Sequence, residues 1–538
     1  MRDLNHLNDR MKKHDLTVKH MNNTLNLATL GKTNILSMLD SGYRRGIELH
    51  NEKVSNNRYI LNLIINCIRF CGAFELALRG HDEKDTSLNP GIFRGLISFS
   101  AELDSALKVH LEKATVFKGT SKTIQNELLK CMLNICQQEI SLEIKKADYL
   151  SITADETTDV SAIFQMVIVY RYIVKDKVVE RFWGFLKPKA HNSEELAECI
   201  KEQLDQHIGN ATDKLIAQTY DGASVMSGNI NGVQAKIKLH YPNANYVHCY
   251  AHQLNLVMAN AASINRNTIE QASGLKRTLL DDVFIYWLTV FHSIMPHVDI
   301  LYNQLQKRET DSTTVKNNIN SFIKEISKIR NQMGTLCEGN IVQSNNKRKH
   351  RGDELKREAI EVCDNIIPQI KQRFDFTGHL VASNLFLADN FEKYDDNFPE
   401  GYFNETINVY PYFDSKKLKT EIQIIYSRTE FRTMSGAVSL LSFIQSENLT
   451  STFGESMKLL KIIITIPMST AESERCFSTL KRIKTFLRNT MHQERLSALA
   501  MLSIEKNFVM HIADFNNKVM ELFASSKERR LDFTFKNF

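Results

Sequence analysis

The stretch Ile152-Thr-Ala-Asp-Glu-Thr-Thr-Asp159 decides the fold, because the spacing of apolar residues changes there from three or four to two. A period of two is typical of β-strands, whereas a period between three and four is typical of helices. Outward from this stretch, the pattern predicts elements in the order β-β-β-α-β-α-β. The predicted segments are residues 149–154, 163–170, 178–185, 193–207, 214–218, 232–239 and 246–250.

Two aspartates follow strands of this series. Asp155 follows the first strand, and Asp221, in Ala217-Gln-Thr-Tyr-Asp-Gly-Ala-Ser224, follows the fourth. The residues between them give room for two strands and a crossover helix, so the two strand ends can be neighbours. Asn192 is the expected N-cap of that helix, with Glu195 three residues later. This order, with acids ending strands one and four, is that of an α/β RNase H-like core with a mixed five-stranded sheet.

Carboxylates at strand ends are suited to divalent cations. Attack on a phosphodiester needs two such ions about 3.5–4 Å apart, held by groups that move little. Glu474, in Ala471-Glu-Ser-Glu-Arg-Cys-Phe-Ser478, completes the set with Asp155 and Asp221. Oxygen ligands favour Mg²⁺ or Mn²⁺ over zinc. The alternative is that each aspartate is an ordinary turn residue or helix cap. Three neighbouring acids remain substitute or supporting ligands: Glu156, Asp159 and Glu472.

The composition is that of a soluble globular protein. With 43% hydrophobic and 24% charged residues in 538, two to four domains are expected, and the 8 Pro and 21 Gly favour helix. The net charge of +6 permits a nucleic-acid partner without demanding one. Nine cysteines without a Cys-x-x-Cys pair indicate reduced thiols. Since no run approaches the ~18–20 apolar residues of a membrane span, we expect no membrane.

We expect a chain that is mostly α overall, because helical periodicity dominates outside the sheet. Its parts are a polar, irregular N-terminal segment (1–56), an N-terminal helical domain (57–147), the first part of the core (148–258), a large all-α insertion (259–449), the completion of the core (450–510) and a C-terminal tail (511–538). Within the insertion, Asn346-Lys-Arg-Lys-His-Arg351 is loop-like and basic. It is either a nuclear-import or DNA-facing patch or a solvated surface loop.

The predicted completion of the core contains two helices. Ser469 and Glu472 form a Ser-x-x-Glu pattern that predicts a capping box and a helix to about residue 488, with Glu474 near its start. A second amphipathic helix, with Leu496, Leu499 and Leu502 in register, packs either on the sheet or on a partner subunit. The cations that follow Glu474, among them Lys481 and Arg482, either neutralise phosphates or form a solvated face.

Two histidine motifs resemble parts of zinc sites. His248-Cys-Tyr-Ala-His252 has the spacing of half a site, but a structural zinc needs four ligands, so we expect no zinc in this chain. A position beside the acids, with His252 contacting DNA or the reacting phosphate, suits this motif better. His14 and His20 are spaced like the last two ligands of a zinc finger, yet no cysteine precedes Cys67.

These motifs together resemble the hAT superfamily of DNA transposases, and within it the finger-containing, transposase-derived proteins of the zinc finger MYM-type group. The resemblance covers roughly residues 57–538. Its most specific parts are Ala77-Leu-Arg-Gly-His-Asp-Glu83, Ala154-Asp-Glu-Thr-Thr-Asp159, Gln218-Thr-Tyr-Asp-Gly-Ala-Ser-Val-Met-Ser-Gly228, His248-Cys-Tyr-Ala-His-Gln-Leu-Asn255 and Ala471-Glu-Ser-Glu-Arg-Cys-Phe-Ser478.

The resemblance implies an RNase H-like core interrupted by a helical insertion, and metal-dependent cleavage and transfer of DNA strands. Asp155, Asp221 and Glu474 match the catalytic acids of the family. Cys249 and His252 match its Cys-x-x-His pair near the active site, and Arg475, Lys481 and Arg482 are expected beside that site or on DNA. The last motif opens the region that the family uses for dimerisation.

Two departures from the family pattern shape our expectation. The chain begins where a DNA-recognising finger would be ending, with residues 1–56 as its remnant, and it contains no Thr-Arg-Trp, since 259–267 pass directly to Thr268-Ile-Glu-Gln-Ala-Ser-Gly274. We therefore expect a nuclear, transposase-like protein that forms a homodimer or higher homo-oligomer through residues 450–510 and has DNA as a partner. Its metal site keeps the three acids but is degenerate. The alternatives are an active Mg²⁺- or Mn²⁺-dependent transposase or nuclease, and a domesticated transcription or chromatin regulator without catalysis.

Overall fold

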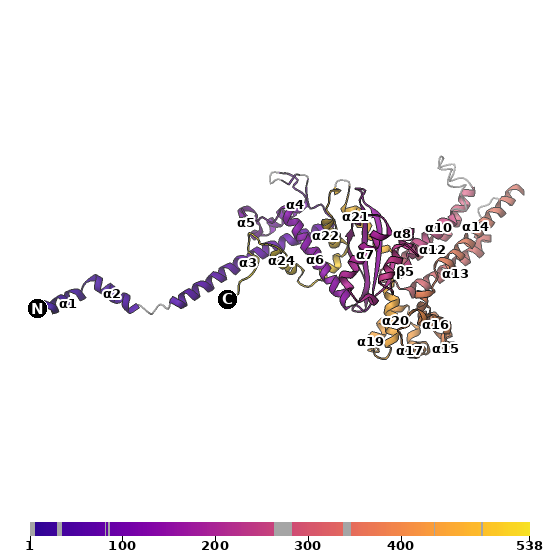
Figure 1. Cartoon of the computed structure of the whole chain (residues 1–538). Helices are drawn as coiled ribbons and strands as arrows, with labels where there is room; N and C mark the ends of the chain where they lie inside the picture. The colour runs from indigo at the N-terminus through magenta and orange to yellow at the C-terminus, as the bar shows by residue number, and fades with distance from the viewer. Residues whose placement is uncertain are drawn as a thin grey trace. The chain divides into compact units, whose positions relative to one another are not determined.

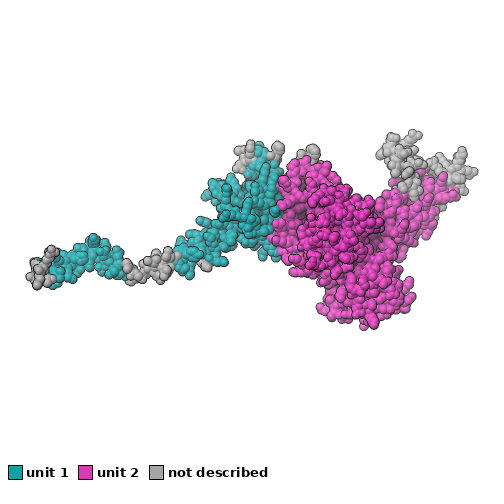
Figure 2. Space-filling model, viewed as in Figure 1, with its two compact units in different colours: residues 1–71, 78–131, 513–538 teal, residues 72–77, 132–512 magenta. Residues whose placement is uncertain are grey.

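The computed structural model describes residues 6–29, 35–80, 82–83, 87–262, 282–336, 346–434, 436–485 and 488–537. The chain divides into two compact units (Figure 2). Unit 1 consists of residues 1–71, 78–131 and 513–538, and unit 2 of residues 72–77 and 132–512. His81, within one of the motifs above, and the stretch 268–274 lie outside the described residues.

Unit 2 contains the predicted mixed sheet of five strands, in the order β3-β2-β1-β4-β5. β1 pairs with β2 and β2 with β3 in antiparallel fashion, whereas β1 pairs with β4 and β4 with β5 in parallel. The strands are β1 (Leu150–Thr158), β2 (Phe164–Val174), β3 (Lys177–Leu186), β4 (Leu215–Tyr220) and β5 (Asn245–His248). The predicted element order is therefore confirmed, with boundaries that differ by a few residues.

Helices before, between and after the strands pack around the sheet. α7 (Ser193–Ile208) begins where the Asn192 side chain accepts the backbone N–H of Glu195 at 2.9 Å, as predicted. α7 packs against α9, α22 packs on β3, α21 contacts β1 and β2, and α20 contacts β2 and β4. The bounds are α8 (Ser224–Ser227), α9 (Val233–His240), α10 (Tyr250–Ala262), α20 (Gly454–Thr465), α21 (Ala471–Ile483), α22 (Gln493–Ile504) and α23 (Lys506–His511).

The segment between β5 and α20 is helical in its described parts, as expected. α12 (Asp282–Leu305), α13 (Ser312–Leu336) and α14 (Asn346–Arg373) pack beside one another and α10 (Figure 1). Two 3₁₀ segments (Gly378–Phe386, Ala388–Asn390) and shorter helices follow: α15 (Phe391–Asp396), α16 (Glu400–Val409), α17 (Ser415–Ser427), α18 (Thr429–Arg432) and α19 (Ala437–Ser446). One buried hydrophobic core runs from the sheet through these helices to α20. The predicted insertion and the sheet thus share a core within one unit.

We expected no segment as long and apolar as a membrane span, but α12 contains one. By length and composition, its part Val283–Leu305 is long and apolar enough to cross a membrane. A core helix of a globular protein satisfies the same two criteria. Trp287, Ile294 and Leu301 of α12 are buried in the shared core, and the helix packs against α10, α13 and α14. Its apolar character therefore has an explanation in the packing of unit 2.

Unit 1 is helical, including part of the segment that we expected to be irregular. Its elements are α1 (Leu7–Asp15), α2 (Val18–Thr29), α3 (Ile35–Ala73), α4 (Ile92–Leu103), α5 (Ser105–Lys113), α6 (Lys122–Lys146) and α24 (Phe515–Ser525), with α3 and α6 ending beyond it. α3 crosses the expected boundary at residue 57, because buried positions already recur every seven residues at Ile47, Val54, Leu61 and Ile68. The end of the chain also belongs to this unit: Phe533 is buried, and Asn57 donates to the backbone oxygen of Asp532.

Two local predictions are wrong. The basic stretch 346–351 is the start of α14 rather than a loop, which is consistent with the good helix propensities of Lys and Arg. The capping box at Ser469 and Glu472 does not form: α21 begins at Ala471, and the Ser469 hydroxyl donates to the backbone oxygen of Leu305 instead. α21 ends at Ile483, five residues earlier than expected.

Candidate active site

Asp155 and Asp221 lie at the same edge of the sheet, on neighbouring parallel strands. The last paired residues of β1 and β4 are Thr153 and Thr219, so each aspartate stands two residues beyond this pair. β1 itself continues past Asp155, paired only with β2. The parallel pairing of β1 and β4 therefore brings together two carboxylates that are far apart in sequence.

Glu474, from α21, affects the ionisation of Asp155. Burial raises the pKa of Asp155 to about 7, although a hydrogen bond from the backbone N–H of Glu156, at 2.8 Å, opposes this shift. The negative charges of Asp221 and Glu474 raise the pKa of Asp155 further. Like charges disfavour ionisation only at short range. Asp221 and Glu474 are thus close enough to Asp155 to affect its ionisation.

Two of the alternative acids have cationic or imidazole partners within the chain. Asp159 forms an ion pair with Lys484 at 2.5 Å, and both side chains are only 1% exposed. Asp159 also accepts hydrogen bonds from the backbone of Ser161 and the amide of Gln165. Glu156 lies 2.5 Å from the ring of His191, so its carboxylate is also engaged.

The third alternative acid, Glu472, is buried and paired with two half-exposed arginines. Arg308 binds its carboxylate through two nitrogens, and Arg475 donates to it at 2.8 Å. Arg475 also donates to the backbone oxygen of Gln306. By contrast, within the described part of the chain no cationic side chain lies within 4 Å of a carboxylate oxygen of Asp155, Asp221 or Glu474. The neighbouring acids are thus paired within the chain, whereas this group has no ion pair and only the charges of His252 and Arg475, which lower the pKa of Glu474.

The Cys-x-x-His motif connects the end of the sheet to the start of α21. The Cys249 sulfur accepts hydrogen bonds from the backbone N–H and hydroxyl of Thr470, at 3.3 and 3.2 Å, and from the backbone N–H of His252. Burial raises the pKa of the Cys249 thiol, so the protonated form is favoured. Cys249 therefore acts as a clamp that holds the first turn of α21, four residues before Glu474, against the sheet edge.

Two histidines lie beside the acids. The rings of His248 and His252 stack with centroids 5.8 Å apart. Burial lowers the pKa of His248, and the nearby His252 lowers it further. The charge of His252 opposes the rise in the pKa of Glu474 that desolvation causes. Gly222 makes room for this pair, since a Cβ atom there would stand 2.7 Å from the His248 ring.

The acidic group fits a divalent cation in the chemistry of its donors. It consists of oxygen ligands, the type that Mg²⁺ and Mn²⁺ prefer, and a bound cation would relieve the repulsion around Asp155. Among the residues with described placement, no three His, Cys, Asp or Glu side chains are already grouped as metal ligands. Binding would thus draw the three carboxylates closer together than they stand.

The predicted cations near Glu474 are mostly engaged elsewhere. Arg475 is held by Glu472, and Arg482 pairs with Glu75. Lys481 is exposed on the surface of α21. The sequence reasoning missed Thr470 and Gly222, which position the group, although both lie in or beside motifs that it singled out. Lys484, another of the cations that follow Glu474, is buried against Asp159.

Two stretches of the chain match models of known protein families. Residues 8–232, which include Asp155 and Asp221, match the family model described as ZMYM1/FAM200, RNase-like domain. Residues 425–508, which include Glu474, match the hAT family C-terminal dimerisation region.

Two curated relatives are similar over part of the chain. The 52 kDa repressor of the inhibitor of the protein kinase of Homo sapiens is 23% identical over 231 residues, which cover 41% of this chain and 30% of that protein. The Mus musculus protein of the same name has the same identity and coverage. The match therefore spans less than a third of each relative. The chain thus joins a region similar to the RNase-like domain of ZMYM1/FAM200 to a region similar to the hAT C-terminal dimerisation region.

Proposed function

We propose that this chain is a self-associating, nuclear DNA-binding protein whose acidic group of Asp155, Asp221 and Glu474 binds Mg²⁺ or Mn²⁺ and supports cleavage of DNA strands. The observation that carries this proposal is the electrostatic coupling of Asp155 on β1 to Asp221 and Glu474, none of which forms an ion pair within the described chain. A cluster of carboxylates of this kind is costly unless a ligand relieves it.

The roles of the residues follow from their positions. A bound Mg²⁺ or Mn²⁺ would supply Lewis-acid activation of the attacking oxygen and stabilisation of the leaving oxygen. Because its pKa is raised to about 7, Asp155 is partly protonated at neutral pH, and a bound cation would favour its ionised form. Thr470 and Cys249 hold α21 so that Glu474 faces the two aspartates. His252 lies where it can contact a scissile phosphate.

The test is metal binding measured together with cleavage. Calorimetric titration with Mn²⁺ should show binding to the wild-type chain and none to Asp155→Asn or Glu474→Gln. The matched control is Glu198→Gln, which removes an exposed carboxylate of α7 and should bind Mn²⁺ as the wild type does. Nicking of supercoiled DNA should likewise occur with the wild type and Glu198→Gln and be lost in Asp155→Asn and Glu474→Gln. Equal Mn²⁺ binding by the wild type and the double variant Asp155→Asn/Glu474→Gln would contradict the proposal.

A domesticated regulator without cleavage is the second candidate. Two observations favour it: the described residues hold no ready-made set of metal ligands, and the arginines nearest to Glu474 are engaged in ion pairs. The relatives are also named as repressors. Mn²⁺ binding and DNA binding without nicking would support this candidate over the enzyme.

Self-association needs a surface outside the core of the C-terminal region. Among the described residues of 425–508, no large hydrophobic side chain is exposed, because Leu496, Leu499, Leu502 and their neighbours pack inside unit 2. We infer that the subunits associate through polar surfaces of this region or through other parts of the chain. Sedimentation of the full chain, with and without about 1 M salt to screen exposed charges, tests this: a polar interface should weaken with salt.

A further inference from the structure

Unit 1 contains a cavity of about 790 Å³ with a strongly cationic lining. Its walls come from α4, the loop before α6, the first turn of α6 and the segment after α24. Five of the thirteen lining residues are cationic and one, Glu528, is acidic. The cations are Arg94, Lys118, Lys527, Arg529 and Arg530. Hydroxyl side chains of Thr120, Ser121 and Thr123 complete the polar lining.

Arg529 fixes the wall formed by the C-terminal segment. Its side chain is 7% exposed, donates to the backbone oxygen of Phe523 at 2.9 and 2.6 Å, and lies 3.6 Å from the centre of the Phe523 ring. It also pairs with Glu127 of α6, as Lys527 does. Because these contacts are internal, Arg529 is an anchor. It holds the flanking exposed residue Arg530 at the cavity.

The wall formed by the loop before α6 is also held in place by packing. Gly119 has a φ of +78°, and a Cβ atom there would stand 2.3 Å from the Cδ1 atom of Ile64 on α3. The loop therefore approaches α3 as closely as glycine allows. Lys118 precedes this glycine and is exposed. Lys118 and Arg530 are thus carried by two backbone segments whose positions are set by packing.

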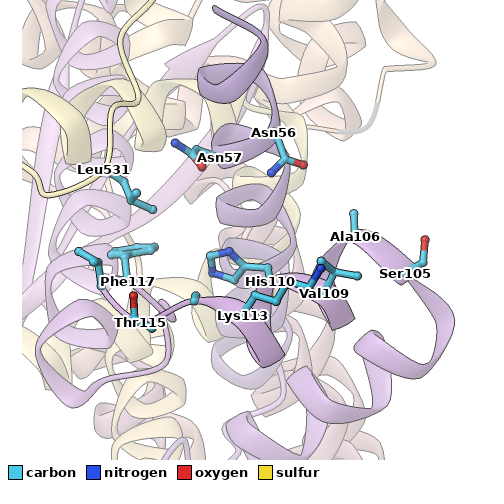
Figure 3. A pocket seen from close by; sticks show the side chains of 12 residues that line it. Asn56, Asn57, Ser105, Ala106, Val109, His110, Lys113, Thr115, Phe117 and Leu531 are labelled. Atoms are coloured by element: carbon cyan, nitrogen blue, oxygen red, sulfur yellow. The ribbon is translucent and has the colours of Figure 1, made fainter. Parts of the chain in front are cut away.

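A second cavity next to the first provides a contrast (Figure 3). It has a volume of about 530 Å³ and shares Val116 and Phe117 with the cationic cavity. Its other lining residues are mostly neutral, with His110 and Asn57 facing the hollow and Lys113 as its one lysine (Figure 3). The positive charge of this part of unit 1 is concentrated in the larger cavity.

We propose that the cationic cavity binds the phosphates of a DNA duplex without sequence preference. Lys and Arg side chains, together with Ser and Thr hydroxyls, are the groups that proteins use for phosphate and sugar contacts. The lining contains no Asn or Gln side chain of the kind that reads adenine edges. The inference rests on the proposed function for the choice of DNA as the polyanion, and it adds a contact in unit 1 that the acids of unit 2 do not provide.

The experiment measures affinity of the full chain for a labelled duplex of arbitrary sequence by fluorescence anisotropy, in EDTA, between about 50 and 200 mM salt. In Lys118→Gln/Arg530→Gln, the slope of log affinity against log salt should fall by about 2, roughly one unit for each lost phosphate contact. The matched control, Lys53→Gln/Lys108→Gln, removes two exposed lysines of the same unit outside the cavity and should keep the wild-type slope.

Three results would overturn the proposal. The first is an unchanged slope in the Lys118/Arg530 variant, and the second is an equal fall in the control. The third is tight binding of pyrophosphate by the wild type with no binding of the duplex, which would make the cavity a site for free phosphates. Because EDTA removes divalent cations, the slope reports phosphate contacts made without the metal. Failure of the metal proposal therefore shows in Mn²⁺ binding and nicking, and failure of the cavity proposal shows in the slope.

Discussion

Replacing Asp155 with Asn should stabilise the metal-free protein, and the gain should grow with pH. The ordinary pKa of the side chain is 3.8, and burial together with Asp221 and Glu474 raises it to about 7. A carboxyl group whose pKa is raised on folding contributes stability below pH 3.8 and loses that contribution as pH rises through 7. At 1.36 kcal/mol for each pKa unit, the wild type loses at most about 4 kcal/mol above pH 7. An amide does not titrate, so Asp155→Asn avoids this loss.

The assay is urea unfolding in EDTA, followed by tryptophan fluorescence. The two tryptophans of the chain, Trp183 and Trp287, are buried in unit 2, so the signal reports the unit that carries the acids. Between pH 5 and pH 7 the stability difference between variant and wild type should widen by at most about 3 kcal/mol. Mg²⁺ or Mn²⁺ should stabilise the wild type and not Asp155→Asn.

Asp159→Asn is the matched control, because the same chemical change at this position breaks a buried ion pair. It leaves the ammonium group of Lys484 buried without a counter-charge, which should cost about 3–5 kcal/mol at both pH values. Its Mn²⁺ binding should equal that of the wild type under conditions where both are folded. If Asp155→Asn is no more stable than the wild type at pH 8 in EDTA, the three acids do not form the repulsive cluster described here.

Three further predictions concern residues that hold unit 2 together. Glu472→Gln removes the buried carboxylate that binds the half-exposed side chains of Arg308 and Arg475 and should cost about 1.5–3 kcal/mol in urea unfolding, whereas Glu474→Gln should cost none. Burial lowers the pKa of His207 to about 4, so the wild type should lose up to about 3 kcal/mol as pH falls from 6.5 to 4, and His207→Gln should flatten this dependence in the same assay. Gly222→Ala places a Cβ atom 2.7 Å from the His248 ring and should weaken Mn²⁺ binding in calorimetry while secondary structure, followed by circular dichroism, persists.

The features that could be predicted from the sequence are those set by residues close together in the chain. The alternation of apolar residues around Asp155, the N-cap at Asn192 and the strand-like run before Asp221 are readable from neighbouring residues, and the structure has them. The order of elements then placed both aspartates on adjacent parallel strands. The clustering with Glu474 could be expected only from the family resemblance, because no periodicity relates positions separated by more than two hundred residues.

Long-range partners account for what the sequence did not reveal. Ser469 and Glu472 have the spacing of a capping box, but Arg308, which follows α12, binds the buried glutamate, and the serine donates to the backbone oxygen of Leu305 at the end of α12. Lys484 has the position of a surface cation on α21, yet Asp159, from a loop 325 residues earlier, draws it inside. In each case the pairing of charges in a buried place outweighs the local preference.

The C-terminal region, residues 425–508, covers part of the edge strand β3, and this limits how the chain can dimerise. β3 is an edge strand, and an edge normally presents unpaired backbone groups to another strand. Here Ser497 of α22 exchanges hydrogen bonds with the backbone N–H and oxygen of Phe185, and Glu505 accepts the N–H of Phe182 at 2.8 Å. These groups of β3 are therefore satisfied within the chain and unavailable for strand pairing with a second subunit.

The same region also supplies Glu474, so its roles in association, folding and the acidic site are physically coupled. Removing residues 450–510 would expose β3, take away the buried partners of Asp159 and eliminate one of the three acids. Loss of self-association in such a truncation would then reflect loss of the fold of unit 2. Point substitutions of exposed charges on α21, such as Lys481→Glu, separate the two effects, because they change the surface and leave the packing against β1, β2 and β3 intact.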